Sequence, residues 1–212
     1  MLPQIAILDP SLTINLPKGI TAGTGMDALA HCIEAYSSPF YHPMAEGTAV
    51  EGLRLVKENI QEVYHNGTNI EARAHMLVAS MMGAAAFQKG LGAIHSITHP
   101  VNSLYHTHHG TTNGTVMPFV LNFNRSVIEK KFDRLANFLN ISNGFEGIVS
   151  WIIDLKKEME IPETLKDMGV NSGDEIKLAP LAQEDPSTGG NPLEMDENKF
   201  EKLIGNCIEG NY

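Results

Sequence analysis

Cysteine is scarce in this sequence of 212 residues, and the two cysteines, Cys32 and Cys207, lie far apart. Two distant cysteines do not make a disulfide framework, so we expect a protein of a reducing, cytoplasmic compartment. Long apolar runs are also missing, since the longest one, residues 76–87, is too short to span a bilayer. The first ten residues lack the charged start and apolar stretch of a signal peptide. From these absences we predict that the protein is neither secreted nor embedded in a membrane.

Basic residues are outnumbered, with 15 Lys and Arg against 25 Asp and Glu, which gives a formal net charge of −10. No cluster of basic residues offsets this charge, so we expect no nucleic-acid partner and no anionic membrane partner. The hydrophobic content of 42% and the charged content of 19% are typical of a globular protein. A chain of this length can bury a substantial core.

Helical periodicity runs through nearly the whole chain. A turn is expected at residues 16–25, and Pro43 is well placed for the first turn of a helix. Helices are predicted over residues 25–37, from 43 onward, and over 70–90, 93–104, 111–121, 125–140, 145–159, 174–183 and 197–209. The fold class is therefore all-α, a multi-helix bundle of eight or nine helices. Its centre is predicted at the third helix, which is apolar on most sides.

One short segment, QIAILDP at residues 4–10, has the pattern of a buried strand rather than a helix. No second strand follows it, and a single strand cannot satisfy its own backbone hydrogen-bonding groups. We therefore expect this segment to pair either with a second copy of the chain or with a segment outside it.

Five of the nine histidines lie within residues 90–110. His95 and His99 are four residues apart, on one face of a predicted helix, where both can be metal ligands or one can handle protons. A pair of half-buried polar residues is the alternative. Asp27 and His31 have the same spacing and can hold one divalent ion, although such an Asp can also simply stabilise the first turn of a helix.

Taken together, these residues predict a metal site of one oxygen and three nitrogens. The third nitrogen would come from His106, His108 or His109, whose alternating pattern cannot aim all three rings at one point. His109 precedes Gly110 at the start of a predicted helix and could project into a pocket. Such a set suits Fe²⁺ or Zn²⁺ and leaves coordination for a substrate oxygen. The ligands would come from at least three helices.

Three motifs resemble the iron-containing (group III) alcohol dehydrogenases, in the same order and over essentially the whole chain. They are LPKGITAGTGMDALAHCIEAY at residues 16–36, FQKGLGAIHSITHPVNSLYHTHHGTTNGTVMPFVLNFN at 87–124, and DPSTGGNP at 185–192. The resemblance implies the helical C-terminal domain of a two-domain architecture like that of dehydroquinate synthase. It also implies an oxidoreductase that oxidises a small alcohol, or reduces an aldehyde, with NAD or NADP as acceptor and an alkoxide bound to the metal.

The same resemblance implies roles for single residues. His99 becomes a catalytic proton relay beside the substrate, whereas His106 and His108 become bystanders. The implied metal ligands are Asp27, His31, His95 and His109.

Three further places in these motifs bear on the site: Glu34, residues 100–102 and Asn113–Gly114. Glu34 could orient His31 through a hydrogen bond, but we favour its interpretation as a surface residue. Two departures from the family pattern, at residues 100–102 and at Asn113–Gly114, are expected to reshape the substrate pocket without touching a ligand.

The dinucleotide-binding half of such an enzyme has no counterpart here, because no glycine-rich phosphate loop follows a strand. We expect residues 1–12 to be a strand and linker remnant of that N-terminal domain, and residues 13–212 to be the helical metal-binding domain. NAD or NADP would bind through the missing domain, and the isolated chain would be nearly inactive. Its uncovered apolar surface would favour a homo-oligomer.

Two other functions fit the same residues. A metal-dependent hydrolase could use such a site to activate water, although the sequence contains no His-Asp dipeptide that would indicate one. A non-catalytic metal-binding or interaction module, derived from the same family, is the second alternative.

Overall fold

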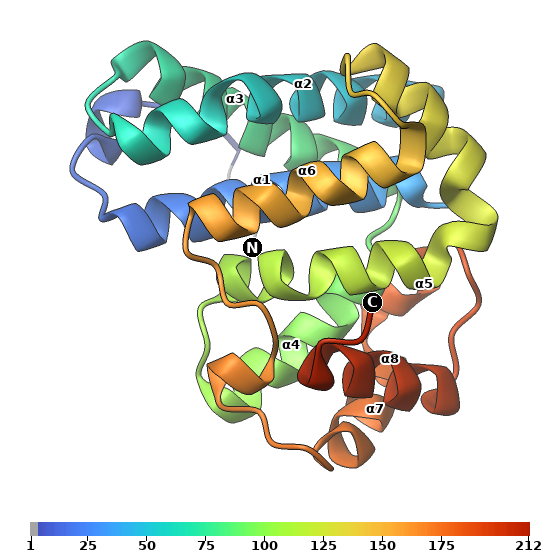
Figure 1. The fold of residues 1–212 in the computed structure, drawn as a ribbon. Coiled ribbons are helices and arrows are strands. Elements are labelled where there is room, and N and C mark those ends of the chain that lie inside the picture. The colour runs from blue at the N-terminus through green and yellow to red at the C-terminus, as the bar shows by residue number, and fades with distance from the viewer. Residues whose placement is uncertain (1–3) are drawn as a thin grey trace.

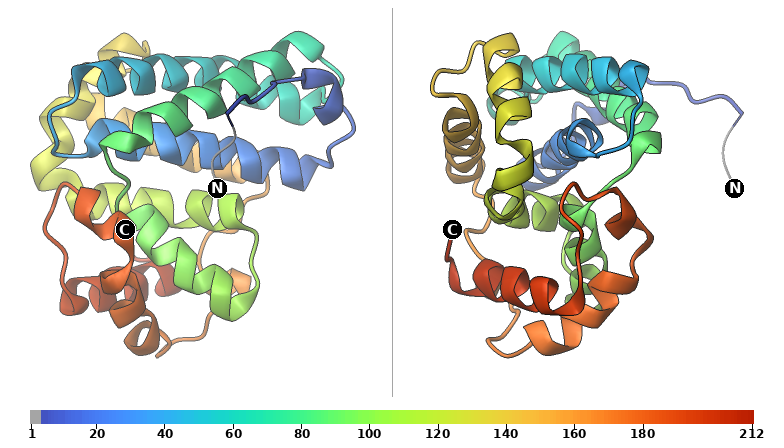
Figure 2. Two further views of the ribbon diagram at one scale, coloured as in Figure 1. Left: turned by 180° about the vertical axis from the view of Figure 1, so that it is seen from behind. Right: turned by 90° about the vertical axis from the view of Figure 1, so that its right-hand side faces the viewer.

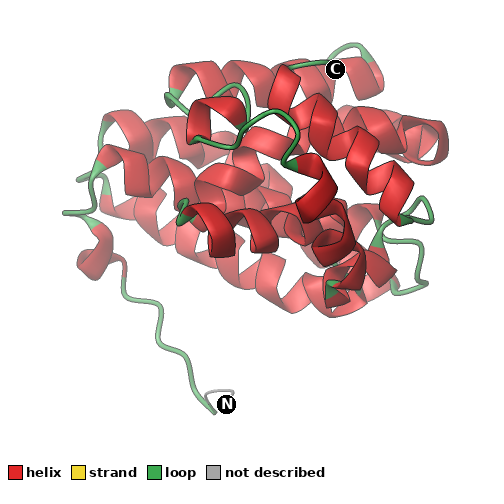
Figure 3. Cartoon of the chain, turned by 90° about the horizontal axis from the view of Figure 1, so that it is seen from below, coloured by secondary structure: helices red, strands yellow, loops and turns green. Residues whose placement is uncertain are grey.

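The computed structural model describes residues 4–212, and helices are the only regular elements in that range (Figure 3). The α-helices are α1 (Lys18–Ser37), α2 (Pro43–His65), α3 (Ile70–Ala86), α4 (Ala93–Tyr105), α5 (His109–Phe138), α6 (Gly144–Glu158), α7 (Glu175–Glu184) and α8 (Glu197–Glu209). Short 3₁₀ helices are η1 (Pro10–Thr13), η2 (Phe87–Lys89), η3 (Lys166–Met168) and η4 (Pro186–Gly190). The predicted all-α bundle is confirmed.

Helices α1 and α5 form the centre of the molecule. In Figure 1, α2, α3 and α6 lie with α1 in the upper part, α4, α7 and α8 lie in the lower part, and α5 runs between them. The two further views in Figure 2 show the same division. Helix α1 packs against α2, α3 and α5, while α5 packs against α1, α4, α6 and α8. Residues on α1 and α5 are therefore held from several sides.

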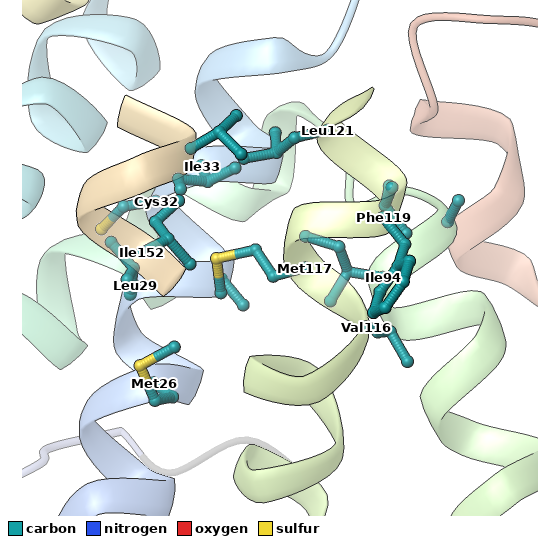
Figure 4. Packing of buried hydrophobic residues seen from close by; sticks show 14 of the residues in the cluster. Met26, Leu29, Cys32, Ile33, Ile94, Val116, Met117, Phe119, Leu121 and Ile152 are labelled. Carbon is teal, nitrogen blue, oxygen red and sulfur yellow. The ribbon is translucent and has the colours of Figure 1, made fainter. Parts of the chain in front are cut away.

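The core between these helices is apolar and closely packed. Figure 4 shows Leu29 and Ile33 of α1 beside Met117 of α5 and Ile152 of α6. Each of these four side chains is at most 1% exposed. Burial of a large apolar side chain contributes about 1.5–3 kcal/mol, so this contact stabilises the packing of α1, α5 and α6.

Helix α3 lies at the edge of the bundle, so the prediction that it forms the centre was wrong. It packs on α1 and α2 and buries only the residues on that side. On its other side Met81 is 49% exposed, and Phe87, directly after the helix, is 36% exposed. The prediction failed because apolar residues on most sides of a helix do not show on which sides other helices actually cover it.

Two predicted helix boundaries were also wrong. Helix α1 begins at Lys18 and not at residue 25. It includes Gly23 and Gly25, which pack so closely that a Cβ would lie 2.5 Å from His108 and 2.9 Å from Ile60, respectively. The predicted helices 111–121 and 125–140 are one continuous helix, α5. Asn124 in its middle exchanges two side-chain hydrogen bonds of 2.9 Å with Asn191. Its amide is thus not free to compete with the helix backbone.

The strand expected over residues 4–10 is not present. Residues 5–9 have no regular structure and η1 follows them, while Ile5 and Ile7 are 81% and 87% exposed. Figure 3 shows this segment leading away from the helices. Without a second strand its backbone groups have no ladder to join. Residues 1–3 of the expected 1–12 remnant lie outside the described residues.

Within residues 4–212 no single helix is long and apolar enough to cross a bilayer. One bent pair, Ile70–Lys89 with Ala93–Tyr105, passes the same test by length and composition only, with an angle of 107° between its halves.

Candidate metal centre

Four of the side chains singled out by their spacing converge on one point between three helices. Asp27 and His31 project from α1, His95 from α4, and His109 is the first residue of α5. The Oδ1 atom of Asp27 lies 3.6 Å from Nε2 of His31, 3.6 Å from Nε2 of His95 and 3.4 Å from Nε2 of His109. One carboxylate oxygen therefore faces three imidazole nitrogens.

These distances fit the coordination of a divalent ion. Ligand atoms 2.0–2.2 Å from an ion, at the corners of a tetrahedron, lie about 3.4 Å from one another. The ligand atoms of Asp27, His31 and His95 all lie within 4.8 Å of one another. His109 is not part of that group and joins it through the 3.4 Å between its Nε2 and Oδ1 of Asp27. Three imidazoles and one carboxylate suit Fe²⁺ or Zn²⁺. The residues present thus fit the metal that the sequence predicts.

A close helix crossing sets the distance between the ligands on α1 and α5. A Cβ atom on Gly110 would lie 2.0 Å from the carbonyl oxygen of Gly23 and 3.0 Å from Cβ of Asp27. Only glycine allows the two backbones to approach so closely. Because Gly110 follows His109 directly, this contact brings Asp27 and His109 together.

The remaining histidines of the cluster lie outside the four-ligand set. His99 is on α4 beside the centre, with its ring stacked on that of His109 at 5.5 Å between centroids. His106 is exposed and has a left-handed φ of 54° after α4. His108 caps α5, since its Nδ1 accepts a hydrogen bond from the backbone N–H of Thr111.

Glu34 is part of the centre, so its interpretation as a surface residue was wrong. Its side chain is 5% exposed, its Oε2 lies 2.6 Å from Nδ1 of His95, and its Oε1 accepts a hydrogen bond of 2.7 Å from the backbone N–H of Ile94. Glu34 follows His31 by three residues on α1, which places it one turn along the ligand face. That spacing was the signal in the sequence.

Two asparagines touch the proposed ligands as well, so the expectation that the departures at residues 100–102 and at Asn113 avoid these residues was wrong. Nδ2 of Asn113 donates to Oδ1 of Asp27 over 2.7 Å and lies 3.2 Å from Nε2 of both His95 and His109. Oδ1 of Asn102 lies 3.1 Å from Nδ1 of His109. The Asn102 contact is on the ring nitrogen opposite Nε2, so it fixes the His109 ring with Nε2 toward the centre. Asn113 instead contacts the proposed ligand atoms themselves.

Charge in the centre favours a cation. Burial by itself lowers the pKa of His95, but the carboxylates of Glu34 and Asp27 outweigh burial and raise this pKa to about 9. Burial also raises the pKa of Asp27, yet the imidazoles of His109, His95 and His31 more than offset it and keep the pKa far below its usual value. Carboxylates that stabilise positive charge on His95 will also stabilise a divalent ion.

Glu34→Gln is expected to weaken Zn²⁺ or Fe²⁺ binding about 10- to 100-fold, the usual range for a partner of a metal-bound histidine. In the variant, the amide oxygen of the glutamine would accept the hydrogen bond from the backbone N–H of Ile94. The NH₂ group of the glutamine would then face Nδ1 of His95. Nδ1 must then accept, and the ring proton moves to Nε2, which loses its lone pair for the metal. Metal titration monitored by calorimetry measures the change.

Glu158→Gln is the matched control, because Glu158 forms a comparable pair with Nε2 of His65 at 2.6 Å on the surface. We expect this variant to bind metal as the wild type does. Equal affinities for Glu34→Gln and the wild type would contradict a role for Glu34 in holding His95.

Comparison with known proteins identifies a family to which this chain is similar. Residues 21–208 match the family model described as Fe-containing alcohol dehydrogenase family, C-terminal. The chain is 38% identical over 213 residues to 4-hydroxybutyrate dehydrogenase of Cupriavidus necator, covering 96% of this chain and 56% of that protein. It is 35% identical over 214 residues to NAD-dependent methanol dehydrogenase of Bacillus methanolicus, covering 97% and 56%.

A solved structure has the same fold. The crystal structure of a 1,3-propanediol oxidoreductase superposes with a TM-score of 0.93 at 32% identity, and the match covers 98% of this chain and 56% of that one. The chain therefore spans about half the length of the relatives that it matches.

Proposed function

This chain belongs to the Fe-containing alcohol dehydrogenase family, and from that premise we propose that it is the metal-binding part of an NAD(P)-dependent dehydrogenase. The reaction would oxidise a small alcohol to an aldehyde, or run in reverse. The observation that carries this proposal is the convergence of Oδ1 of Asp27 with Nε2 of His31, His95 and His109.

In the proposed mechanism the four ligands Asp27, His31, His95 and His109 hold Fe²⁺ or Zn²⁺. The bound ion supplies Lewis acidity, which lowers the pKa of the substrate hydroxyl. Exposure supports substrate entry from the side of His99 and His109, whose side chains are 42% and 39% exposed, against 2% for His95.

His99 is the proposed proton relay. When the alcohol is oxidised, His99 would take the hydroxyl proton and pass it to solvent. A bound nicotinamide would supply the acceptor for the hydride, which carries two electrons from the carbinol carbon. In the reverse direction His99 returns the proton. The His99 ring stacks on that of His109, and its Nδ1 contacts Asp185 instead of Asp27. The ring therefore lies beside the four proposed ligands without being one of them.

The nicotinamide cofactor is proposed to bind through a further, dinucleotide-binding domain. Among residues 4–212 no glycine-rich phosphate loop follows a strand. We therefore expect the 212-residue chain by itself to bind metal but to turn over little alcohol. A cytoplasmic location, homo-oligomerisation and the choice between NAD and NADP stay predictions.

The test is an assay of the chain joined to its dinucleotide-binding domain. We expect metal-dependent formation of reduced cofactor from NAD or NADP with small alcohols, and the relatives suggest 4-hydroxybutyrate, 1,3-propanediol and methanol as first substrates. Residues 1–212 alone should bind metal with little turnover. Absorbance of the reduced nicotinamide follows the reaction, and chelation of the metal should stop it.

Two outcomes would contradict the proposal. Hydrolysis without reduced cofactor would indicate a metal-dependent hydrolase. Metal binding without any reaction of the joined protein would indicate a non-catalytic module.

A further inference from the structure

His99 has a partner that its position in the sequence does not indicate. Its Nδ1 lies 2.7 Å from Oδ2 of Asp185, which is 86 residues further along the chain, between α7 and η4. Within residues 4–212, Nε2 of His99 has no hydrogen-bond partner. Asp185 thus contacts the proposed proton relay at Nδ1 and leaves Nε2 available.

The carboxylate of Asp185 is itself fixed. Its side chain is 10% exposed, and its Oδ1 accepts a hydrogen bond of 2.8 Å from the backbone N–H of Ser187. One oxygen therefore caps η4, and the other faces His99. A carboxylate held at both oxygens keeps one orientation and does not need to reorganise when its partner gains a proton.

The segment after Asp185 is attached to helix α4, which carries His99. The hydroxyl of Thr188 lies 2.8 Å from Oγ of Ser96 and 2.7 Å from the carbonyl oxygen of Ala182. A Cβ on Gly190 would lie 2.0 Å from the carbonyl oxygen of Leu91, so the backbones pack without space between them. These contacts hold Asp185 at a set distance from α4.

From this arrangement we propose that Asp185 is a positioning residue for the dehydrogenase reaction, a proposal that rests on the function proposed above. By accepting the Nδ1–H hydrogen of His99, Asp185 fixes the orientation and the tautomer of the ring. Nε2 is then the ring nitrogen that takes the hydroxyl proton of the alcohol and later releases it. A carboxylate that orients a histidine in this way is a general device in acid–base catalysis.

Asp185→Asn tests the proposal because it reverses the hydrogen bond at nearly constant shape. The backbone N–H of Ser187 requires the oxygen of the introduced amide, so the NH₂ group faces Nδ1 of His99. We expect ¹⁵N NMR of the Zn²⁺-loaded chain to show neutral His99 as the Nδ1–H tautomer in the wild type and as the Nε2–H tautomer in the variant. A His99→Asn variant assigns the signal.

In the protein joined to its dinucleotide-binding domain, we expect Asp185→Asn to lower kcat about 100-fold, the size of a proton-transfer contribution. KM and metal content should stay unchanged. Asp196→Asn is the matched control, since Asp196 also caps a helix, with Oδ1 accepting from the backbone N–H of Lys199 over 2.9 Å, and touches no histidine. It should behave as the wild type in both measurements.

The outcomes separate this proposal from the one on which it rests. A variant Asp185→Asn that keeps the Nδ1–H tautomer would overturn the positioning role. A reversed tautomer with unchanged kcat would overturn the relay role of His99, and with it the catalytic meaning of Asp185. If Asp185→Asn fails to fold, Asp185→Ser keeps a cap on Ser187 but cannot reach His99, and a mixture of tautomers is expected.

Discussion

Replacing His95 or His109 with alanine is expected to abolish stoichiometric binding of Fe²⁺ or Zn²⁺. Each change removes one of three nitrogens that face Oδ1 of Asp27. The loss in affinity should exceed the 10- to 100-fold effect of removing a mere partner of a ligand, so we expect more than about 100-fold. The metal content of the purified protein and calorimetric titration measure it.

Thermal unfolding offers a second measurement of the same loss. A ligand at 100 times its dissociation constant stabilises the folded state by about 2.7 kcal/mol, so added metal should raise the Tm of the wild type. His95→Ala and His109→Ala should show no such rise. His106→Asn is the control, because His106 is exposed and asparagine tolerates its φ of 54°. Metal binding by His95→Ala at wild-type affinity would refute the four-ligand centre.

Gly110→Ala is expected to weaken both the fold and the metal centre. The new Cβ would lie 2.0 Å from the carbonyl oxygen of Gly23, an atom of the α1 backbone that cannot turn aside. Helices α1 and α5 must separate, which should cost about 1–3 kcal/mol of unfolding free energy. Because Asp27 and His109 lie on either side of this contact, metal affinity should fall more than tenfold, by about 1.4 kcal/mol or more. Urea unfolding and metal titration measure the two effects.

Gly205→Ala is the matched control in helix α8. There the nearest atom to an added Cβ is Cγ of Glu175 at 4.0 Å, so space is available. We expect this variant to be unchanged or up to about 1 kcal/mol more stable, as alanine favours a helix over glycine. If Gly110→Ala binds metal as tightly as Gly205→Ala, the helix crossing does not set the distance between the ligands.

Most of the fold could be predicted from local patterns, and the errors have physical reasons. Pro43 and Gly90 mark ends of helical segments through backbone geometry alone. The helix after Pro43 begins where expected, whereas the α-helix before Gly90 ends at Ala86 and continues to Lys89 as η2. The break expected before residue 125 was wrong, because Asn124 bonds to Asn191 instead of to its own backbone. A local sequence pattern cannot show that a side chain will form hydrogen bonds with a residue far away in the sequence.

By itself, the sequence determined the helical class and the residues proposed as ligands. The four-residue spacing of Asp27 with His31 places two ligands on one helix face, and this period is a property of the helix alone. The motif resemblance selected His109 among three histidines. Only the tertiary structure decided which side chains hold the histidines: Glu34 meets His95 across 61 residues, and Asp185 meets His99 across 86. Such pairs depend on how helices pack, and no local period encodes the packing of distant helices.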